Sequence, residues 1–433
     1  MTLNDLKNRV VQAIDQNRSR IIGFGDAILS CPELGYREEK TSRIVKETFR
    51  ELGIPYEDDL ALTGVKGKLA GCEEGLNICL MGEMDALPCG GDLRPNAGGI
   101  SHACGHNAQM AALLGAAIGL SESGVMSGLP GKVSLMATPA EEFIDLDFRK
   151  KLIREGRIKY AGGKQELIYE GAFDDVDMAM MIHAAPDEPG RKLYIKGYNL
   201  GFITKTITFH GKAAHGSKPF DGVNALNAAA LSIIGMHTNR EIFREEERIR
   251  IHPIITKGGD VVNTVPDEVC IDTYVRGATL EAIKKGNDCV ERSCRGAVQM
   301  IGAEVSFENT SGYLPLCEDA LLSGLMAENA EALMGAESIV SGREITGSTD
   351  AGDLSCLIPV IQPSIGGFEG GLHSEQFHIT NRETAYLDAA KLLALTAVDL
   401  LYNDCEKGKA VKESFTPLLT KEQYLSYLEE GIS

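Results

Sequence analysis

The spacing of apolar residues divides the chain into helical and strand-like stretches. Apolar side chains recur at helical spacing over residues 3–52, with a break that contains Pro and Gly at residues 31–36. Two later stretches also predict helices, at residues 109–120 and 391–401. Short apolar runs predict buried strands, at residues 77–82, 132–137, 177–183 and 359–363. Because strands and helices alternate, we expect an α/β fold in which helices flank a mixed, mostly parallel sheet.

The pattern changes between residues 199 and 312. Strand-like stretches alternate there with two helical ones, in the order 202–209, 225–234, 250–255, 269–276, 279–301 and 304–309. This β-α-β-β-α-β order is that of a ferredoxin-like domain. We therefore predict two domains: one formed by residues 1–198 and 313–433, and an inserted α+β domain formed by residues 199–312.

A short motif with one cysteine and two histidines, residues 101–107, is the first candidate for chemistry. Cys104 and His106 offer a thiolate and an imidazole to a transition-metal ion, and Gly105 between them lets both side chains turn into one cleft. The alternative is that Cys104 is a small buried apolar residue and the histidines are ordinary core or surface groups. The motif alone leaves both interpretations open.

Further metal donors stand where predicted strands end, which is the edge where ligands gather in α/β sheets. Carboxylates follow two of the strands and a histidine ends a third, at Glu83, Asp85, Glu141, Glu142 and His183. A late Gly-rich turn leads to His373. Paired glutamates after a strand can also be a solvated helix start. Beside the other donors we interpret the pair as one metal ligand and one general base.

The motifs together resemble a known family over essentially the whole chain. In order, they are H-A-C-G-H-N, P-A-E-E, the strand that ends in His183, the His215 and Asn263 motifs and the Gly-rich approach to His373. They resemble the dinuclear-metal amidohydrolases, which include aminoacylases, hippurate and auxin-conjugate hydrolases and carboxypeptidases. That family has a zinc-exopeptidase-like catalytic domain. Within it, G-E-M-D-A-L-P and Asn107 are similar to the p-aminobenzoyl-glutamate hydrolase branch, whereas many other relatives carry Asp at that position.

The resemblance implies a site for two divalent metal ions. Cys104 would bridge the ions. Four residues would complete their coordination, His106, Glu142, His183 and His373. Glu141 would be the general base, and Glu83 and Asp85 would support the ligands. These donor types accept Mn, Zn, Co or Ni; the resemblance favours Mn, with Zn second.

The inserted domain would complete the site. Residues 210–217 resemble the lid motif of the family, in which His215 would stabilise the oxyanion in the active site of the partner subunit. We therefore expect a homodimer that forms through residues 199–312. Asn263 and Arg276 resemble positions that bind the carboxylate or carbonyl end of the substrate, although an Arg at a strand end can equally form a surface ion pair.

One segment departs from the family pattern. Relatives usually pass almost directly from the paired glutamates to a Gly-rich turn, whereas here residues 143–161 intervene. An insertion at this place lies beside the expected substrate cleft, or it is a mere surface elaboration. Substrate identity is therefore not carried over from any one relative.

Composition narrows the choice of partners. The formal net charge of −19 opposes binding to nucleic acid or to an anionic membrane. The chain has no apolar stretch of about 18 residues, and its start lacks a basic segment followed by an apolar run. Eleven cysteines are scattered without a disulfide framework. We therefore expect a cytoplasmic protein that acts on a small molecule, without nucleic-acid or membrane partners.

The function that we expect is metal-dependent hydrolysis of the amide bond of an N-acyl or N-aroyl amino acid, such as a p-aminobenzoyl-glutamate-like conjugate. The alternative is a dipeptidase or aminopeptidase of the same family, which would require a free amine in place of the acyl group. A third hypothesis is a non-catalytic binding protein that keeps the fold. It predicts damaged site residues, and the sequence lacks none of them.

Overall fold

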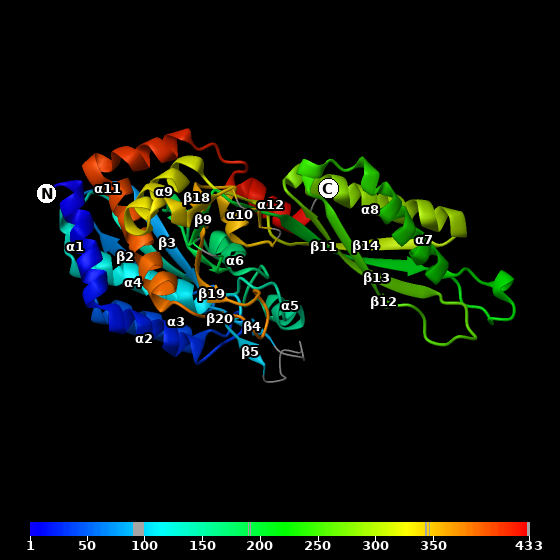
Figure 1. Ribbon diagram of the computed structural model, residues 1–433. Coiled ribbons are helices and arrows are strands. Elements are labelled where there is room, and N and C mark those ends of the chain that lie inside the picture. The colour runs from blue at the N-terminus through cyan, green and yellow to red at the C-terminus, as the bar shows by residue number, and fades with distance from the viewer. Residues whose placement is uncertain (90–98, 189, 191, 343, 346, 431–433) are drawn as a thin grey trace. The chain divides into compact units, whose positions relative to one another are not determined.

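The computed structural model describes residues 1–433 except 90–98, 189, 191, 343, 346 and 431–433 (Figure 1). The chain forms two compact units. Unit 1 comprises Met1–Tyr198, Cys317–Glu344 and Asp353–Leu418. Unit 2 comprises Asn199–Leu316, Ile345–Gly352 and the segment that starts at Leu419.

Unit 2 contains three segments that the sequence analysis assigned to the other domain: residues 313–316, Ile345–Gly352 and the segment from Leu419. The reason is tertiary packing. Helix α12 (Lys421–Glu430) packs against strand β14 (Glu304–Ser311). Gly352 lies so close to the carbonyl oxygen of Leu314 that a Cβ would come within 1.9 Å of it. Contacts between segments far apart in the sequence leave no mark in hydrophobic periodicity, so the predicted boundaries missed them.

Unit 1 is built on a six-stranded mixed sheet. Its strands lie in the order β1 (Tyr56–Leu60), β2 (Gly64–Ala70), β6 (Lys132–Thr138), β3 (Asn77–Glu83), β7 (Met178–Met180) and β18 (Val360–Ile361). Neighbours from β6 to β18 run parallel, whereas β1 with β2 and β2 with β6 are antiparallel. Every residue of β3 is buried, as in a central strand with helices on both faces. The predicted α/β class is confirmed.

Helices flank this sheet in Figure 1: α1 (Leu3–Gln16), α2 (Arg18–Leu29), α3 (Glu39–Glu51), α4 (His106–Glu122), α6 (Gly163–Glu170), α9 (Ala320–Met334) and α11 (Ala389–Ser414). Two further helices are short, α5 (Leu146–Arg154) and α10 (Ala351–Ser355). Helix α4 is the centre of the core, because it is apolar on all sides and packs against α1, α2, α11 and β3. The helical backbone of α11 is interrupted at Tyr402–Cys405, just after the helix predicted at 391–401.

A second sheet of unit 1 holds His183. Its strands are β16 (Ile339–Ser341), β9 (Leu193–Ile195), β19 (Ser364–Glu369) and β20 (His378–Ile379), with β8 (His183–Pro186) also paired to β19. The single strand predicted at 177–183 was therefore wrong: β7 ends at Met180, and His183 begins β8 in the other sheet. Where the chain passes from one sheet to the other, the N–H of His183 donates to the carbonyl of Pro363, which stands between β18 and β19.

Short elements complete the chain: the pair β4 (Leu87–Pro88) and β5 (Ile100–Ser101), a π-helical turn at Glu383–Asp388, and a small sheet of β15 (Leu316–Cys317), β10 (Tyr198–Asn199) and β17 (Glu344–Ile345). Among the described residues, no helix combines the length and the apolar character that crossing a membrane would require.

Unit 2 is an antiparallel sheet with two long helices on one face (Figure 1). The strand order is β12 (Arg250–Lys257), β13 (Glu268–Gly277), β11 (Gly201–His210) and β14, and the helices are α7 (Ala225–Thr238) and α8 (Leu280–Ile301). Alternate residues of β11 point into the core beneath the helices, among them Ile203, Ile207 and Phe209. The predicted β-α-β-β-α-β order is confirmed.

Candidate metal centre

Five side chains that the sequence predicts as metal ligands converge in unit 1. Cys104 and His106 stand at the start of α4, Glu142 follows β6, His183 begins β8 and His373 follows β19. The two sheets and the central helix thus deliver donors from four separate parts of the chain to one place.

The turn before α4 requires a glycine. Gly105 has a left-handed backbone with φ of 82°, and a Cβ there would lie 2.4 Å from the Cβ of Ala184. This close approach lets Cys104 and His106 lie against strand β8, whose first residue is His183. The C-x-H spacing noted in the sequence therefore brings both donors to the site because its middle residue is a glycine.

Two groups of donor atoms share Cys104. One contains His106 and His183, the other Glu142 and His373, and the donor atoms within each group lie within 4.8 Å of one another. The Cys104 Sγ lies 3.4 Å from His183 Nε2 and 3.3 Å from His373 Nε2. The distance from His373 Nε2 to Glu142 Oε1 is 3.2 Å. A thiolate between two donor sets is the arrangement that a bridging ligand requires.

Glu141, the expected general base, lies beside these donors. It forms a third group with Glu83 and His106, and its Oε2 is 3.8 Å from His106 Nε2. Only 7% of Glu141 is exposed. A buried carboxylate at this distance is able to exchange protons with a water molecule held at the same centre.

Asp85 fixes the orientation of His106. Both the carbonyl oxygen and Oδ1 of Asp85 face His106 Nδ1, at 2.8 and 3.0 Å. Because both atoms are acceptors, Nδ1 carries the proton and donates, which leaves the lone pair of Nε2 for a metal ion. Burial alone would raise the pKa of Asp85, but the hydrogen bond and charge of His106, the Glu142 N–H and the Arg149 charge hold it below its usual value.

Glu83 is held by two residues that the sequence analysis did not single out. Lys164 Nζ donates to Glu83 Oε1 at 2.6 Å, and both side chains are fully buried. Gln109 Nε2 donates to Glu83 Oε2 at 2.7 Å. Burial alone would raise the pKa of Glu83, but Lys164 and His106 lower it. Two features of the sequence could have pointed to these residues: Gln109 is a polar residue inside the otherwise small and apolar run of α4, and Lys164 follows a Gly-rich turn.

The donor set fits a divalent transition-metal ion. Burial raises the pKa of the Cys104 thiol, and the Glu142 charge raises it further. Burial alone would lower the pKa of His106, but Cys104, Glu83 and Asp85 raise it. Within the described residues, His106 Nε2 and Glu142 Oε1 are buried and form no hydrogen bond of good geometry. A cation satisfies both atoms and favours the thiolate.

The remaining predicted residues lie in unit 2. His215 stands on an exposed loop, residues 211–223, and bridges to Thr264 beside Asn263. The structure therefore brings His215 and Asn263 onto adjacent loops. Arg276 lies on β13, where its Nη1 donates to Ser348 Oγ at 2.6 Å and its guanidinium covers the ring of Phe202.

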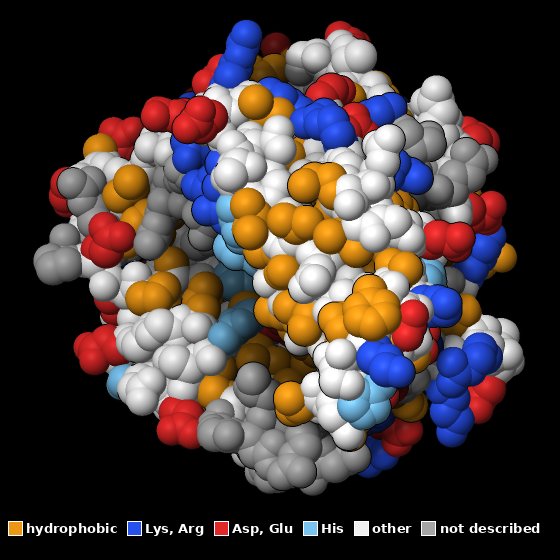
Figure 2. All heavy atoms as spheres, turned by 90° about the vertical axis from the view of Figure 1, so that its right-hand side faces the viewer, with side chains coloured by type: hydrophobic (Ala, Val, Ile, Leu, Met, Phe, Trp, Pro, Cys, Tyr) orange, Lys and Arg blue, Asp and Glu red, His pale blue; other side chains and the backbone are white. Residues whose placement is uncertain are grey.

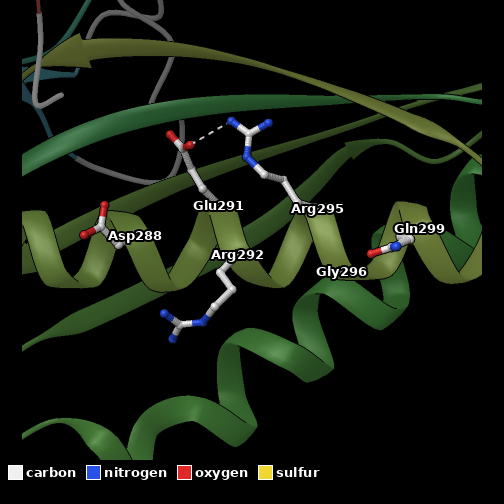
Figure 3. Close-up of a pocket in the computed structure, with 6 residues that line it drawn as sticks. All are labelled: Asp288, Glu291, Arg292, Arg295, Gly296 and Gln299. Carbon is white, nitrogen blue, oxygen red and sulfur yellow. Dashed lines mark hydrogen bonds and ion pairs between the residues drawn. The ribbon is translucent and has the colours of Figure 1, made fainter.

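The lining of a hollow on α8 includes none of the predicted residues (Figure 3). Its lining comes from one helix: Asp288, Glu291, Arg292, Arg295, Gly296 and Gln299. Arg295 pairs with Glu291 at 3.0 Å, which also accepts a hydrogen bond from the buried Lys205. These charges neutralise one another on the helix surface, and the hollow has no metal donor cluster or nucleophile.

A cysteine shared by two donor groups, next to a buried carboxylate at the edge of an α/β sheet, defines a metal-dependent hydrolase. Residues 79–399 match the family model described as peptidase family M20/M25/M40, and the chain therefore belongs to this family. The protein is accordingly an enzyme that hydrolyses C–N bonds of amides or peptides, and the family assignment made from the motifs is confirmed.

Named relatives span most of the chain. The Xaa-Arg dipeptidase of Homo sapiens is 28% identical over 460 residues, which cover 98% of this chain and 95% of that protein. The N-acetyl-L-cysteine deacetylase of Bacillus subtilis (strain 168) is 29% identical over 342 residues, 76% of each chain. The crystal structure of an aminobenzoyl-glutamate utilization protein from Klebsiella pneumoniae superposes with a TM-score of 0.65 at 18% identity, covering 90% of this chain and 98% of that one.

Proposed function

We propose that this hydrolase holds two divalent metal ions and cleaves the amide bond of an N-acyl or N-aroyl amino acid. The ligands would be Cys104, His106, Glu142, His183 and His373. The observation that carries the proposal is the single cysteine between two groups of donor atoms, with Glu141 beside them. When bound, such ions polarise the scissile carbonyl and make water acidic enough to ionise near neutral pH.

Glu141 moves the proton in this mechanism. Its carboxylate accepts a proton from the attacking water and delivers it to the leaving amine nitrogen. Asp85 keeps the proton of His106 on Nδ1. The carboxylate of Glu83, which the buried Lys164 holds, has its Oε2 3.2 Å from His106 Nε2; both atoms are acceptors, and a cation at the centre would attract both of them. These neighbours hold the ligand in place while the proton moves.

Arg276 is our candidate for binding the carboxylate of the amino-acid product. It is partly buried, and within the described residues its polar contact is a neutral hydroxyl, that of Ser348, rather than a carboxylate. Burial lowers the pKa of its guanidinium, but the group stays charged at neutral pH. A cation without an acidic partner suits a substrate carboxylate, and Asn263 would bind the carbonyl end.

The second candidate function is dipeptide hydrolysis. It is favoured by the length of the match to the human Xaa-Arg dipeptidase, 98% of this chain, whereas the N-acetyl-L-cysteine deacetylase match covers 76%. The two functions use the same centre and differ in whether the substrate has a free amine or an acyl cap.

His215 would stabilise the oxyanion. The main-chain N–H of Ser217 donates to His215 Nδ1 at 3.1 Å. Because Nδ1 is thereby an acceptor, the proton of the neutral ring is on Nε2, which is free to donate. A hydrogen-bond donor on an exposed loop suits the negative oxygen that develops in amide hydrolysis.

The same unit would form a homodimer, in which His215 serves the partner subunit. β12 is an edge strand, and exposed apolar residues lie on it and on the neighbouring loops: Phe220, Ile254, Ile255, Val261 and Val262. Figure 2 shows hydrophobic side chains gathered on the surface at the right-hand side of Figure 1. Such a patch on an edge strand is typical of a protein–protein interface.

Manganese is the ion that we propose for both positions, with zinc second and cobalt or nickel compatible with the donors. We also propose a cytoplasmic location. All eleven cysteines are free, which suits a reducing compartment.

The test is a substrate panel on the metal-free full chain, with Mn, Zn and Co each added back separately. The substrates are p-aminobenzoyl-glutamate, N-acetyl amino acids and unblocked Xaa-Arg dipeptides. A kcat/KM at least about tenfold higher for capped substrates supports the main proposal. The reverse order favours the dipeptidase. A chain that binds no ion and cleaves nothing would contradict both.

A further inference from the structure

The inserted segment after the paired glutamates sends an arginine into the interior. Arg149 of α5 is 1% exposed, whereas Lys150 and Arg154 of the same helix are exposed. Arginine is rarely buried to this degree unless it is paired with acceptors. The segment is therefore more than a surface elaboration, and its buried end identifies what it contacts.

The guanidinium of Arg149 grips the main chain around Glu141. Nη1 donates to the carbonyl oxygens of Ala140 and Ala161, at 3.3 and 2.6 Å, and Nη2 donates to the carbonyl oxygen of Glu142. We call residues 140–142 the glutamate strap. Arg149 therefore binds the carbonyl of the residue before Glu141 and the carbonyl of the residue after it.

Two N–H groups of the strap donate to buried carboxylates. Ala140 N–H donates to Glu38 Oε1 at 2.8 Å, and Glu142 N–H donates to Asp85 Oδ2 at 2.9 Å. Ala140 has a φ of 54°, an uncommon backbone conformation for a residue other than glycine. A strained strap keeps its shape only if its surroundings fix it, and Arg149 is the part of those surroundings that the insertion supplies.

The pocket around the guanidinium is built to receive it. A Cβ on Gly35 would lie 2.8 Å from the Cα of Ala140 and 2.8 Å from Arg149 Nη2. Because the Cα belongs to the backbone, this position requires a glycine. The ring of Tyr36 faces the guanidinium with its centroid 5.5 Å from the central carbon. The Tyr36 hydroxyl donates to the carbonyl of Tyr160, at the other end of the insertion.

We propose that Arg149 is a positioning residue, which holds the glutamate strap so that the carboxylates of Glu141 and Glu142 face the metal centre. This inference rests on the proposed function of that centre. The planar guanidinium of Arg149 has two terminal nitrogens, and one donates to the carbonyl before Glu141 while the other donates to the carbonyl after it. The ammonium of a lysine has a single nitrogen and does not reach both carbonyls. The insertion thus supports the reaction by holding the main chain that carries Glu141 and Glu142.

A purely structural role makes different predictions. If Arg149 only anchored α5, its loss would lower the melting temperature and leave the metal affinity and kcat of the folded protein unchanged. If it positions the strap, the fraction that folds binds metal more weakly and turns over more slowly.

The experiment compares Arg149→Met and Arg149→Lys with wild type, and uses Arg154→Met as the matched control on the exposed end of α5. Manganese binding to the metal-free full chain is measured by titration calorimetry, and kcat and KM are measured at saturating manganese. We expect Arg149→Met to weaken at least one binding event by about 10- to 100-fold and to lower kcat by a similar factor, with KM changed less than about threefold. Arg149→Lys should recover folding but not the lost kcat, and Arg154→Met should match wild type.

Wild-type metal affinity and kcat in both Arg149 variants would overturn this inference alone. If Arg149→Met does not fold, Arg149→Lys decides the outcome by itself, since it keeps the charge. A wild-type chain that binds no manganese or zinc would instead overturn the proposed function, and this inference with it.

Discussion

The glutamate strap of unit 1 and the His215 loop of unit 2, residues 211–223, hold their functional side chains in opposite ways. In the strap, the main-chain groups on both sides of Glu141 are fixed by Glu38, Asp85 and Arg149. The side chain of His215 is exposed, and the contacts around it are local, chiefly the N–H and hydroxyl of Ser217. The contacts that fix the strap all come from the same chain. The exposed side chain of His215, in contrast, is open to contact by another molecule.

The largest expected effect concerns the strap itself. Glu141→Gln removes the proposed proton acceptor and keeps the shape of the side chain, so kcat/KM should fall by roughly 10²- to 10⁴-fold. Metal content, measured by mass spectrometry of the native protein, should remain that of wild type. Unchanged hydrolysis would show that another group takes the proton.

The next effect concerns the loop. His215→Ala should lower kcat by roughly 10²- to 10³-fold, because the proposed oxyanion donor is lost. Since the side chain is exposed, metal binding and the melting temperature should not change. If the mutation removed bound metal, His215 would be a ligand and the contrast between the two regions would fail. Ser217→Ala keeps the main-chain donor to Nδ1 and should be much milder.

Breaking a buried ion pair in unit 1 should lower the unfolding free energy much more than breaking an exposed ion pair in unit 2. Lys164→Met leaves Glu83 buried without its cation, which should cost about 3–5 kcal/mol of unfolding free energy in urea denaturation. Arg295→Gln breaks the surface pair with Glu291 and should cost less than about 1 kcal/mol. Similar losses in both variants would contradict the assignment of Lys164 to a closed internal network.

The last prediction concerns the pH dependence of stability, through Glu38, which accepts a hydrogen bond from the strap. Burial and the neighbouring Asp85 raise the pKa of Glu38 to about 7, from 4.5. The folded chain therefore binds this proton more tightly than the unfolded chain. This contribution to stability is fully present below about pH 4.5 and is lost as the pH rises to 7, at a rate on the order of 1 kcal/mol per pH unit.

Glu38→Gln should flatten the decline between these pH values, as measured by urea unfolding at half-unit steps. A variant whose stability falls as steeply as that of wild type would assign the pH dependence to another group. No corresponding change is expected for His215→Ala, whose side chain is exposed.

The sequence was sufficient for the donors and insufficient for their supports. Cys104, Glu142 and His373, which the structure brings together, could be proposed as ligands because metal ligands have a narrow choice of side chains and often stand at strand ends. Arg149 and Lys164 have no such signature, since a buried cation is identical in sequence to an exposed one. What distinguishes them is the set of carbonyls or carboxylates around them, which comes from tertiary packing.

The fold shows the same division. Local periodicity predicted β3, β6, α4 and the order of elements in unit 2, because each of these is defined by neighbouring residues. The transfer of Ile345–Gly352 to unit 2 depends on contacts across long stretches of sequence, and so does the change of sheet between β7 and β8 at Pro363. Periodicity contains no information about either one.

The distance along the chain between Cys104 and His373 bears on how the protein folds. These residues are 269 positions apart, and most of unit 2 is synthesised between them, yet their side chains touch. The site is therefore absent until β19 has paired with β8, late in synthesis. Ions bind the closed chain and not the open one, so at a thousandfold excess over Kd they favour closure by about 4 kcal/mol. Metal supply during synthesis would then determine how much of the chain closes correctly, as well as how fast the finished enzyme works.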